Sequence, residues 1–137
     1  MSTWPDTEGA LKTFLAADTA IAAIVGSRVF FGMPTNVTDA DFPMVTLQRV
    51  GGGEAAGDAP VDEALVQIDC WGAVRDKASA WTLCSAVRDR LTQRGDVALN
   101  GTVRAGLVVD SVIWLPDPDN ARARYSVTAE VTAWLIA

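Results

Sequence analysis

The stretch of sequence that decides the fold runs from Asp62 to Arg94, DEALVQIDCWGAVRDKASAWTLCSAVRDRLTQR. Its first part alternates: Val66, Ile68 and Cys70 share one face of an extended chain, and polar residues stand between them. Apolar residues then recur at helical spacing, at Ala80, Leu83, Cys84, Val87 and Leu91. The pattern predicts a strand, a short turn over residues 71–76 and an amphipathic helix to Arg94 that docks on the apolar face of its own sheet.

Two helices and two strands are predicted before this stretch. Asp6 and Asp18 are suited to cap the helices, because a carboxylate accepts hydrogen bonds from the free N–H groups of a first turn. Two strands follow, at 28–31 and 44–50, and a loop over residues 32–43 connects them. Residues 51–60, GGGEAAGDAP, contain four glycines and no large apolar side chain, which predicts a mobile hairpin tip.

The C-terminal part is predicted to be extended. Asn100-Gly101 indicates a hairpin turn of type I′, and residues 102–115 form a strand broken near Gly106. An exposed loop at 116–120 precedes clean alternation over 124–136, a long strand. The order of elements predicts a mostly antiparallel sheet with helices packed on one face, a two-layer α+β fold, in one domain covering residues 1–137.

Composition narrows the range of functions. The chain has 137 residues, a net charge of −6 and no histidine, so it lacks the usual general base and the commonest metal ligand. No basic stripe typical of nucleic-acid binding is present, and no run of about 20 apolar residues predicts a membrane span. Cys70 and Cys84 fall on apolar faces, where we expect small core side chains. We therefore expect no catalytic residue, metal, cofactor or enzymatic activity.

Three tryptophans stand out because strand parity places them among polar residues. Trp71 shares the parity of Gln67 and Asp69, and Trp114 and Trp134 lie likewise on the polar faces of later strands. Either loops of the same chain fold back over them, or another subunit covers them. Trp81 borders the helix stripe and is expected to complete the core. The candidate interface residues are Gly51, Gly52, Gly53, Glu54, Asp58, Trp71, Trp114 and Trp134.

Several segments together resemble a known family. They are ALKTFLAADTAIAAIVGSRVF from Ala10, DFPMVTL from Asp41, and VQIDCWGAVRDKASAWTLCSAVRDRL from Val66. This pattern, with the long C-terminal strand, resembles the tail terminator proteins of long-tailed bacteriophages, also called tail completion or tail-to-head joining proteins. The resemblance implies an α+β fold, a hexameric ring and no catalytic motif. The family's long hairpin corresponds to Met44–Trp71, with residues 51–60 at its tip.

The resemblance also implies partners and a location. Such a ring lies at the head-proximal end of the virion tail. It caps the tube built from the tail tube protein, ends tube growth and docks on the head–tail connector protein. We expect synthesis in the bacterial host cytoplasm, and DNA that passes through the lumen without specific binding. The alternative is a small soluble α+β ligand-binding or enzymatic domain. That alternative predicts a pocket with converging polar groups, and the sequence offers no such cluster.

Overall fold

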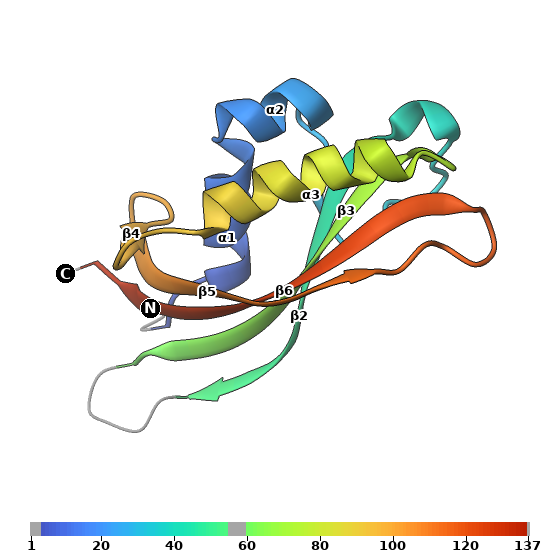
Figure 1. Cartoon of the computed structure of the whole chain (residues 1–137). Helices are drawn as coiled ribbons and strands as arrows, with labels where there is room; N and C mark the ends of the chain where they lie inside the picture. The colour runs from blue at the N-terminus through green and yellow to red at the C-terminus, as the bar shows by residue number, and fades with distance from the viewer. Residues whose placement is uncertain (1–3, 55–59, 137) are drawn as a thin grey trace.

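The computed structural model describes residues 4–54 and 60–136 (Figure 1). Over these residues the helices are α1 (Thr7–Ala16), α2 (Thr19–Val25) and α3 (Lys77–Leu91), with one 3-10 turn, η1 (Asp39–Asp41). The strands are β1 (Val29–Phe31), β2 (Met44–Glu54), β3 (Asp62–Val74), β4 (Val97–Ala98), β5 (Val103–Trp114) and β6 (Arg122–Leu135).

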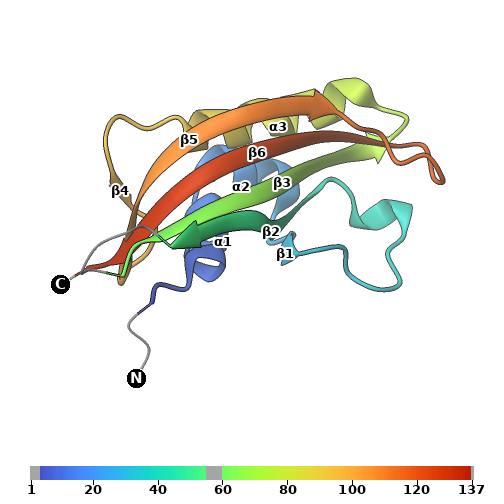
Figure 2. The ribbon, with the colours of Figure 1, turned by 90° about the horizontal axis from the view of Figure 1, so that it is seen from below.

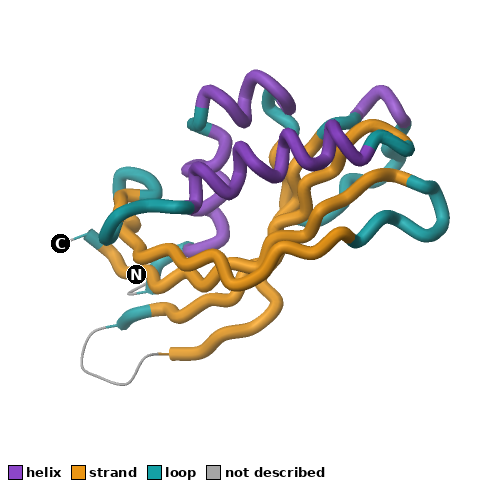
Figure 3. The backbone as a smooth tube through the Cα atoms, in the orientation of Figure 1, coloured by secondary structure: helices purple, strands orange, loops and turns teal. Residues whose placement is uncertain are grey.

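The strands form one curled sheet in the order β1-β2-β3-β6-β5-β4. Every neighbouring pair is antiparallel except β1 and β2, which run parallel. The predicted α+β class with a mostly antiparallel sheet is therefore confirmed. Figure 3 shows the helices on one side of the strands, and Figure 2 shows β5 along one edge of the sheet and β1 along the other.

The core lies between the helices and one face of the sheet. Helix α3 packs on β3 and β6, and its predicted apolar stripe is fully buried. Val66, Ile68 and Cys70 of β3 face this core, as the alternation predicted. Cys70 and Cys84 are both buried free thiols, and the Cys84 sulfur and complete burial raise the pKa of the Cys70 thiol.

The junction between β3 and α3 differs from the prediction. The expected turn over residues 71–76 is shorter, because β3 continues to Val74. The Asp76 carboxylate caps α3 by accepting from the Ser79 N–H, and the Ser79 hydroxyl accepts from the Ala73 N–H at 2.8 Å. Gly72 permits this close packing, since a Cβ there would lie 2.5 Å from the Ala80 nitrogen. Helix α3 ends at Leu91, before the predicted Arg94.

The two N-terminal helices begin where the sequence predicted. Asp6 caps α1 by accepting from the Gly9 N–H at 3.1 Å, and Asp18 caps α2 by accepting from the Ile21 N–H at 3.1 Å. Arg90 of α3 ties α3 to α1, because its guanidinium lies over the Phe14 ring and its Nε donates to the Phe14 carbonyl at 3.0 Å.

The predicted hairpin tip at residues 51–60 is too long. Gly51 to Glu54 belong to β2 and pair with β3 down to Asp62, after a bulge at Val50. Gly52 needs its glycine there, because its φ is +105° and a Cβ would overlap the Glu63 carbonyl. Backbone pairing with β3 therefore prevails over the low strand propensity of the glycines. Residues 55–59 of the predicted tip lie outside the described residues.

Two predictions about the C-terminal strands also need correction. Strand β5 passes through Gly106 without a break, and its irregularity is a bulge at Asp110. The hairpin at Asn100 exists, but its turn is not type I′, because neither Asn100 nor Gly101 has a positive φ. The Asn100 side chain fixes the turn instead, by accepting from the Val103 N–H at 2.8 Å.

Candidate protein-interaction surfaces

The face of the sheet without helices is covered at one end by the protein's own loop. The residues packed there are Phe30, Val37, Phe42, Met44 and Trp71. Trp71 is only 6% exposed and donates from Nε1 to the Thr46 hydroxyl at 3.0 Å. The Arg124 guanidinium lies 4.5 Å from the centre of the Trp71 ring system. For Trp71, folding back of the chain itself therefore accounts for the burial.

Trp114 does not lie on the helix-free face, which corrects the prediction from strand parity. The bulge at Asp110 shifts the register, so Trp114 pairs with Tyr125 and shares its face with Val112 and Val127. One extra residue in a strand turns every later side chain to the other face. Its neighbour Ile113 then faces the opposite side and is 54% exposed.

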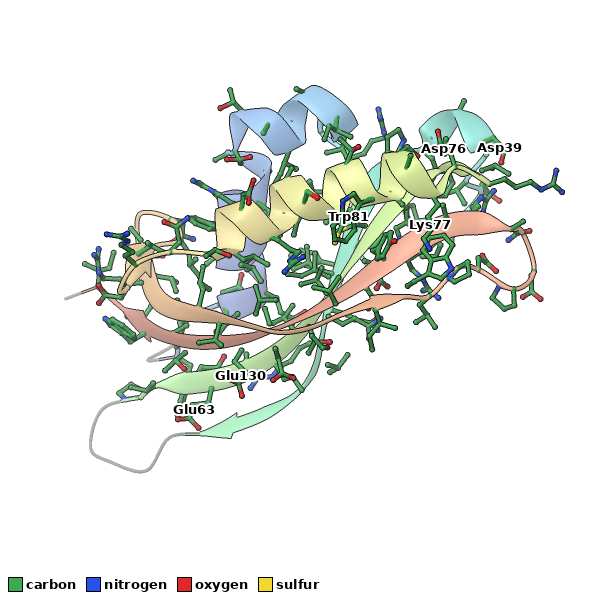
Figure 4. The ribbon with its side chains drawn as sticks, viewed as in Figure 1. Asp39, Glu63, Asp76, Lys77, Trp81 and Glu130 are labelled. Atoms are coloured by element: carbon green, nitrogen blue, oxygen red, sulfur yellow. The ribbon has the colours of Figure 1, made fainter. Side chains whose placement is uncertain are left out.

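The shifted Trp114 joins an aromatic cluster beside α3. The Tyr125 ring lies 5.1 Å from the Trp114 ring and 5.1 Å from the Trp81 ring. The Lys77 ammonium lies 4.8 Å from the Trp114 ring, and Lys77 and Trp81 lie one turn apart on α3 (Figure 4). Trp81 is 43% exposed and Trp114 36%, so Trp81 does not complete the core as predicted. The cluster presents aromatic rings at the surface.

The other predicted interface residues lie at the opposite end of the sheet. Trp134 of β6 is half-buried and pairs in register with Arg104 on the helix-free face. Gly51, Gly52 and Gly53 stand in β2, and Glu54 is its last residue. Asp58 lies outside the described residues. The structure thus separates Trp71 and Trp114 from the glycine segment, and it does not gather the predicted residues into one site.

The open end of the helix-free face holds a shallow hollow of about 430 Å³. Leu65 and the exposed Val108 supply apolar surface, and the Glu63 and Glu130 side chains lie on the same face (Figure 4). Among the described residues, Thr132 supplies the one hydroxyl side chain of the hollow, and no cysteine lines it. It offers an acidic, partly apolar surface for a protein segment.

A polar cluster ties the long hairpin to α1 on the helix side. The Arg49 guanidinium forms two hydrogen bonds with the Asp62 carboxylate, at 2.8 and 2.7 Å, and the Thr7 hydroxyl donates to the same carboxylate. The Arg49 hydrogen bonds, helped by Thr7, hold the pKa of Asp62 below its ordinary 3.8, although burial acts in the opposite direction. All these groups are satisfied by each other, so the cluster is structural.

A further exposed apolar site was not predicted. Phe31 is 55% exposed and Met33 40%, at the β1 edge of the sheet. A hollow of about 590 Å³ lies between Phe31 and α1, and the residues that line it on the α1 side are Asp6, Gly9, Lys12, Thr13, Ala16 and Ala17. The sequence contained a signal for this site, because Phe30 and Phe31 are adjacent in a strand and adjacent side chains point to opposite faces of a sheet. Since Phe30 packs on the helix-free face, Phe31 must point to the other face.

Within residues 4–54 and 60–136, no group of three or more His, Cys, Asp or Glu side chains could hold a metal ion. Among the same residues, no helix has the length and apolar character to cross a membrane.

The comparisons with known proteins give a family and a matching fold. The family model of tail completion protein gp17 matches residues 9–135. No curated protein is significantly similar in sequence. A chain of the virion of the native gene transfer agent (GTA) particle has the same fold, with a TM-score of 0.66 and 20% identity over 94% of this chain and 98% of that chain. This protein therefore belongs to the tail completion protein gp17 family, a family of bacteriophage tail structural proteins.

Proposed function

We propose that this chain forms a ring, with six copies, that caps the tail tube, ends tube growth and joins the tail to the head connector. The observation that carries the proposal is the match of the tail completion family to residues 9–135, nearly the whole chain. The gene transfer agent chain, which has this fold over 98% of its length, comes from a virion and so supports a place in such a particle. In this proposal the protein sits at the head-proximal end of the tail and acts without catalysis.

The surface chemistry supports an assembly role. Exposed aromatic rings at Trp81 and Trp114, and exposed apolar side chains at Phe31 and Met33, are typical of protein–protein contacts. Within the described part of the chain, no cysteine lines either hollow, and the Thr13 hydroxyl donates to the Gly9 carbonyl of its own helix at 3.1 Å. No specific observation favours the alternative, a ligand-binding or enzymatic domain.

DNA passes through the proposed ring without specific binding. Six copies of a chain with net charge −6 carry a charge of roughly −36, which repels a polyanion at low salt. Glu63 and Glu130 place part of this negative charge on the helix-free face. A salt-dependent gel shift with linear duplex DNA would contradict this part of the proposal.

The β2–β3 hairpin is proposed as the arm that contacts the tail tube. Its described end consists of Gly51–Glu54 paired with Asp62–Leu65, beyond the bulge at Val50. Replacing residues 55–59 by Asn-Gly should leave the melting temperature nearly unchanged, because closure entropy depends weakly on loop length. The same change should impair tail completion. Normal virion yield with the shortened arm would move the tube contact to another surface, such as that around Trp134.

Removal of the gene from the phage tests the proposed function directly. Electron microscopy of the lysate should then show over-long tails, or tails and filled heads that remain unjoined. Supplying the chain from a plasmid should restore joined particles, and a plasmid carrying a frameshifted copy is the matched control. Particles with tails of normal length joined to heads, formed without the protein, would contradict the proposal.

A further inference from the structure

We infer that the subunit contact of the assembled protein joins two different surfaces at opposite edges of the sheet, arranged head to tail between successive copies of this chain. The tryptophan patch comprises Trp81, Trp114 and Leu115, on α3 and at the end of β5. The phenylalanine patch comprises Phe31 and Met33 with the hollow beside α1. This inference rests on the proposed self-assembly, and it names the partner of each patch as a second copy.

The placement of the patches favours head-to-tail contact. One patch lies at the β5 edge of the sheet and the other at the β1 edge, with β2, β3 and β6 between them (Figure 2). A two-fold dimer needs one surface that is complementary to itself, whereas a ring needs two different surfaces on each subunit. A chain with one apolar patch at each edge meets the second requirement.

The shapes and charges of the two patches also fit each other. The tryptophan patch presents large rings, which pack at steep angles against the Tyr125 ring, and tryptophan is a frequent anchor of interfaces. The phenylalanine patch has a hollow of about 590 Å³, which has room for an aromatic side chain. Lys77 adjoins the tryptophan patch, and the Asp6 carboxylate lines the hollow. Lys12, the other charged side chain of the hollow, already lies over the Phe31 ring at 4.8 Å.

The strand edges are compatible with the same arrangement. Beyond β4, residues 106–111 of β5 have no strand partner on their outer side among the described residues, and neither do residues 48–53 of β2 beyond β1. The two stretches lie at the same height along the strands. Across the sheet, Val108 of β5 pairs with Glu130, Glu130 pairs with Leu65, and Leu65 pairs with Gly51 of β2.

The two edge strands also have suitable directions. They run in opposite directions, so copies that share one orientation bring β5 and β2 together antiparallel. The bulges at Val50 and Asp110 interrupt both edges, which leaves most of the contact to the side chains of the patches.

Mixing two variants tests the inference. Trp81→Glu damages only the tryptophan patch, and Phe31→Glu damages only the phenylalanine patch. Native mass spectrometry and light scattering should show wild-type self-association at concentrations up to about 1 mM. Each variant alone should associate at least about 30-fold more weakly, the loss typical of removing an interface anchor. A mixture of the two should form heterodimers and nothing larger, because one intact patch of each kind remains.

The controls separate the possible failures. Ala23→Glu adds the same charge at an exposed position of α2 outside both patches and should associate like the wild type. Circular dichroism melting verifies folding, and Trp81→Gln and Phe31→Thr replace any variant that unfolds. A wild-type protein that stays monomeric, variants that associate normally, or a mixture without heterodimers would each overturn the inference. None of these results alters the gene-removal experiment, which tests tail completion separately.

Discussion

The two faces of the sheet are built on different principles. On the helix face, apolar side chains of β3, β5 and β6 alternate in register and are buried by α1, α2 and α3 within one continuous core. On the helix-free face, the loop that carries Phe42 covers the end around Trp71. The other end, with Glu63, Val108 and Glu130, lies open (Figure 4). The stability of the fold therefore comes from the helix face and from the covered end of the helix-free face. The open end of the helix-free face is left available for partner proteins.

The largest loss of stability is expected at the covered end of the helix-free face. Trp71→Ala should lower the free energy of unfolding by about 3–5 kcal/mol, because it removes a buried ring and leaves the Thr46 hydroxyl without its partner. Urea unfolding at pH 7 measures the change, and Trp134→Ala, at the other end of the same face, is the control and should cost less. Equal losses at the two positions would erase the distinction between the covered and the open end.

A somewhat smaller loss is expected in the core of the helix face. Leu83 is fully buried between α3 and the sheet, so Leu83→Ala should cost about 2–5 kcal/mol. Thr82→Ala, at the neighbouring exposed position of α3, should change stability by less than about 0.5 kcal/mol. If Leu83→Ala unfolds at the wild-type urea midpoint, the helix face does not hold the core described here.

The cluster of Arg49, Asp62 and Thr7 should make stability depend on pH. The folded state lowers the pKa of Asp62 below 3.8, so its contribution is present above about pH 4 and is lost as pH falls through the lowered pKa. Asp62→Asn should lower the free energy of unfolding by about 1–3 kcal/mol at pH 7. This range is below that of a fully buried ion pair, because the Arg49 side chain is 33% exposed and water screens its charge.

The same substitution should flatten the decline of stability below pH 4. Urea unfolding at pH 7 and pH 3 measures this difference, with Asp89→Asn at an exposed position of α3 as the control. A decline with acid that is the same in Asp62→Asn and in the wild type would show that the cluster contributes nothing to the pH dependence.

The smallest effect is expected on the open end of the helix-free face. Glu130→Gln removes one exposed charge and should change the free energy of unfolding by less than about 0.5 kcal/mol. A destabilisation above 1 kcal/mol would indicate that this end is part of the folded core. Differential scanning calorimetry of the two proteins at the same concentration decides between these outcomes.

Sequence patterns predicted the elements that obey a simple period. The stripe of α3, the alternation of β3 and β6, and the caps at Asp6 and Asp18 follow from local chemistry and were confirmed. Pattern arguments failed where pairing across the sheet overrides local preference. The glycines after Val50 are poor strand formers, yet β3 holds them in the sheet as far as Glu54.

The candidate surfaces were harder to predict, because a single bulge residue in a strand changes the face to which every later side chain of that strand points. The bulge at Asp110 leaves no clear mark in the sequence, and it moves Trp114 to the opposite face and exposes Ile113. The exposure of Trp81 depends in turn on where Tyr125 and Trp114 lie. The role of the predicted interface residues remains a proposal, with Trp114 now assigned to a different surface from Trp71 and Trp134.

Imaging of the assembled particle tests the central claim most directly. Cryo-electron microscopy of the virion should show six copies of this chain in a ring at the head-proximal end of the tail, between the tail tube and the connector. In that ring, the tryptophan patch of each copy should face the phenylalanine patch of the next. Finding the chain at another position, or finding no ring of this protein at that junction, would contradict the account.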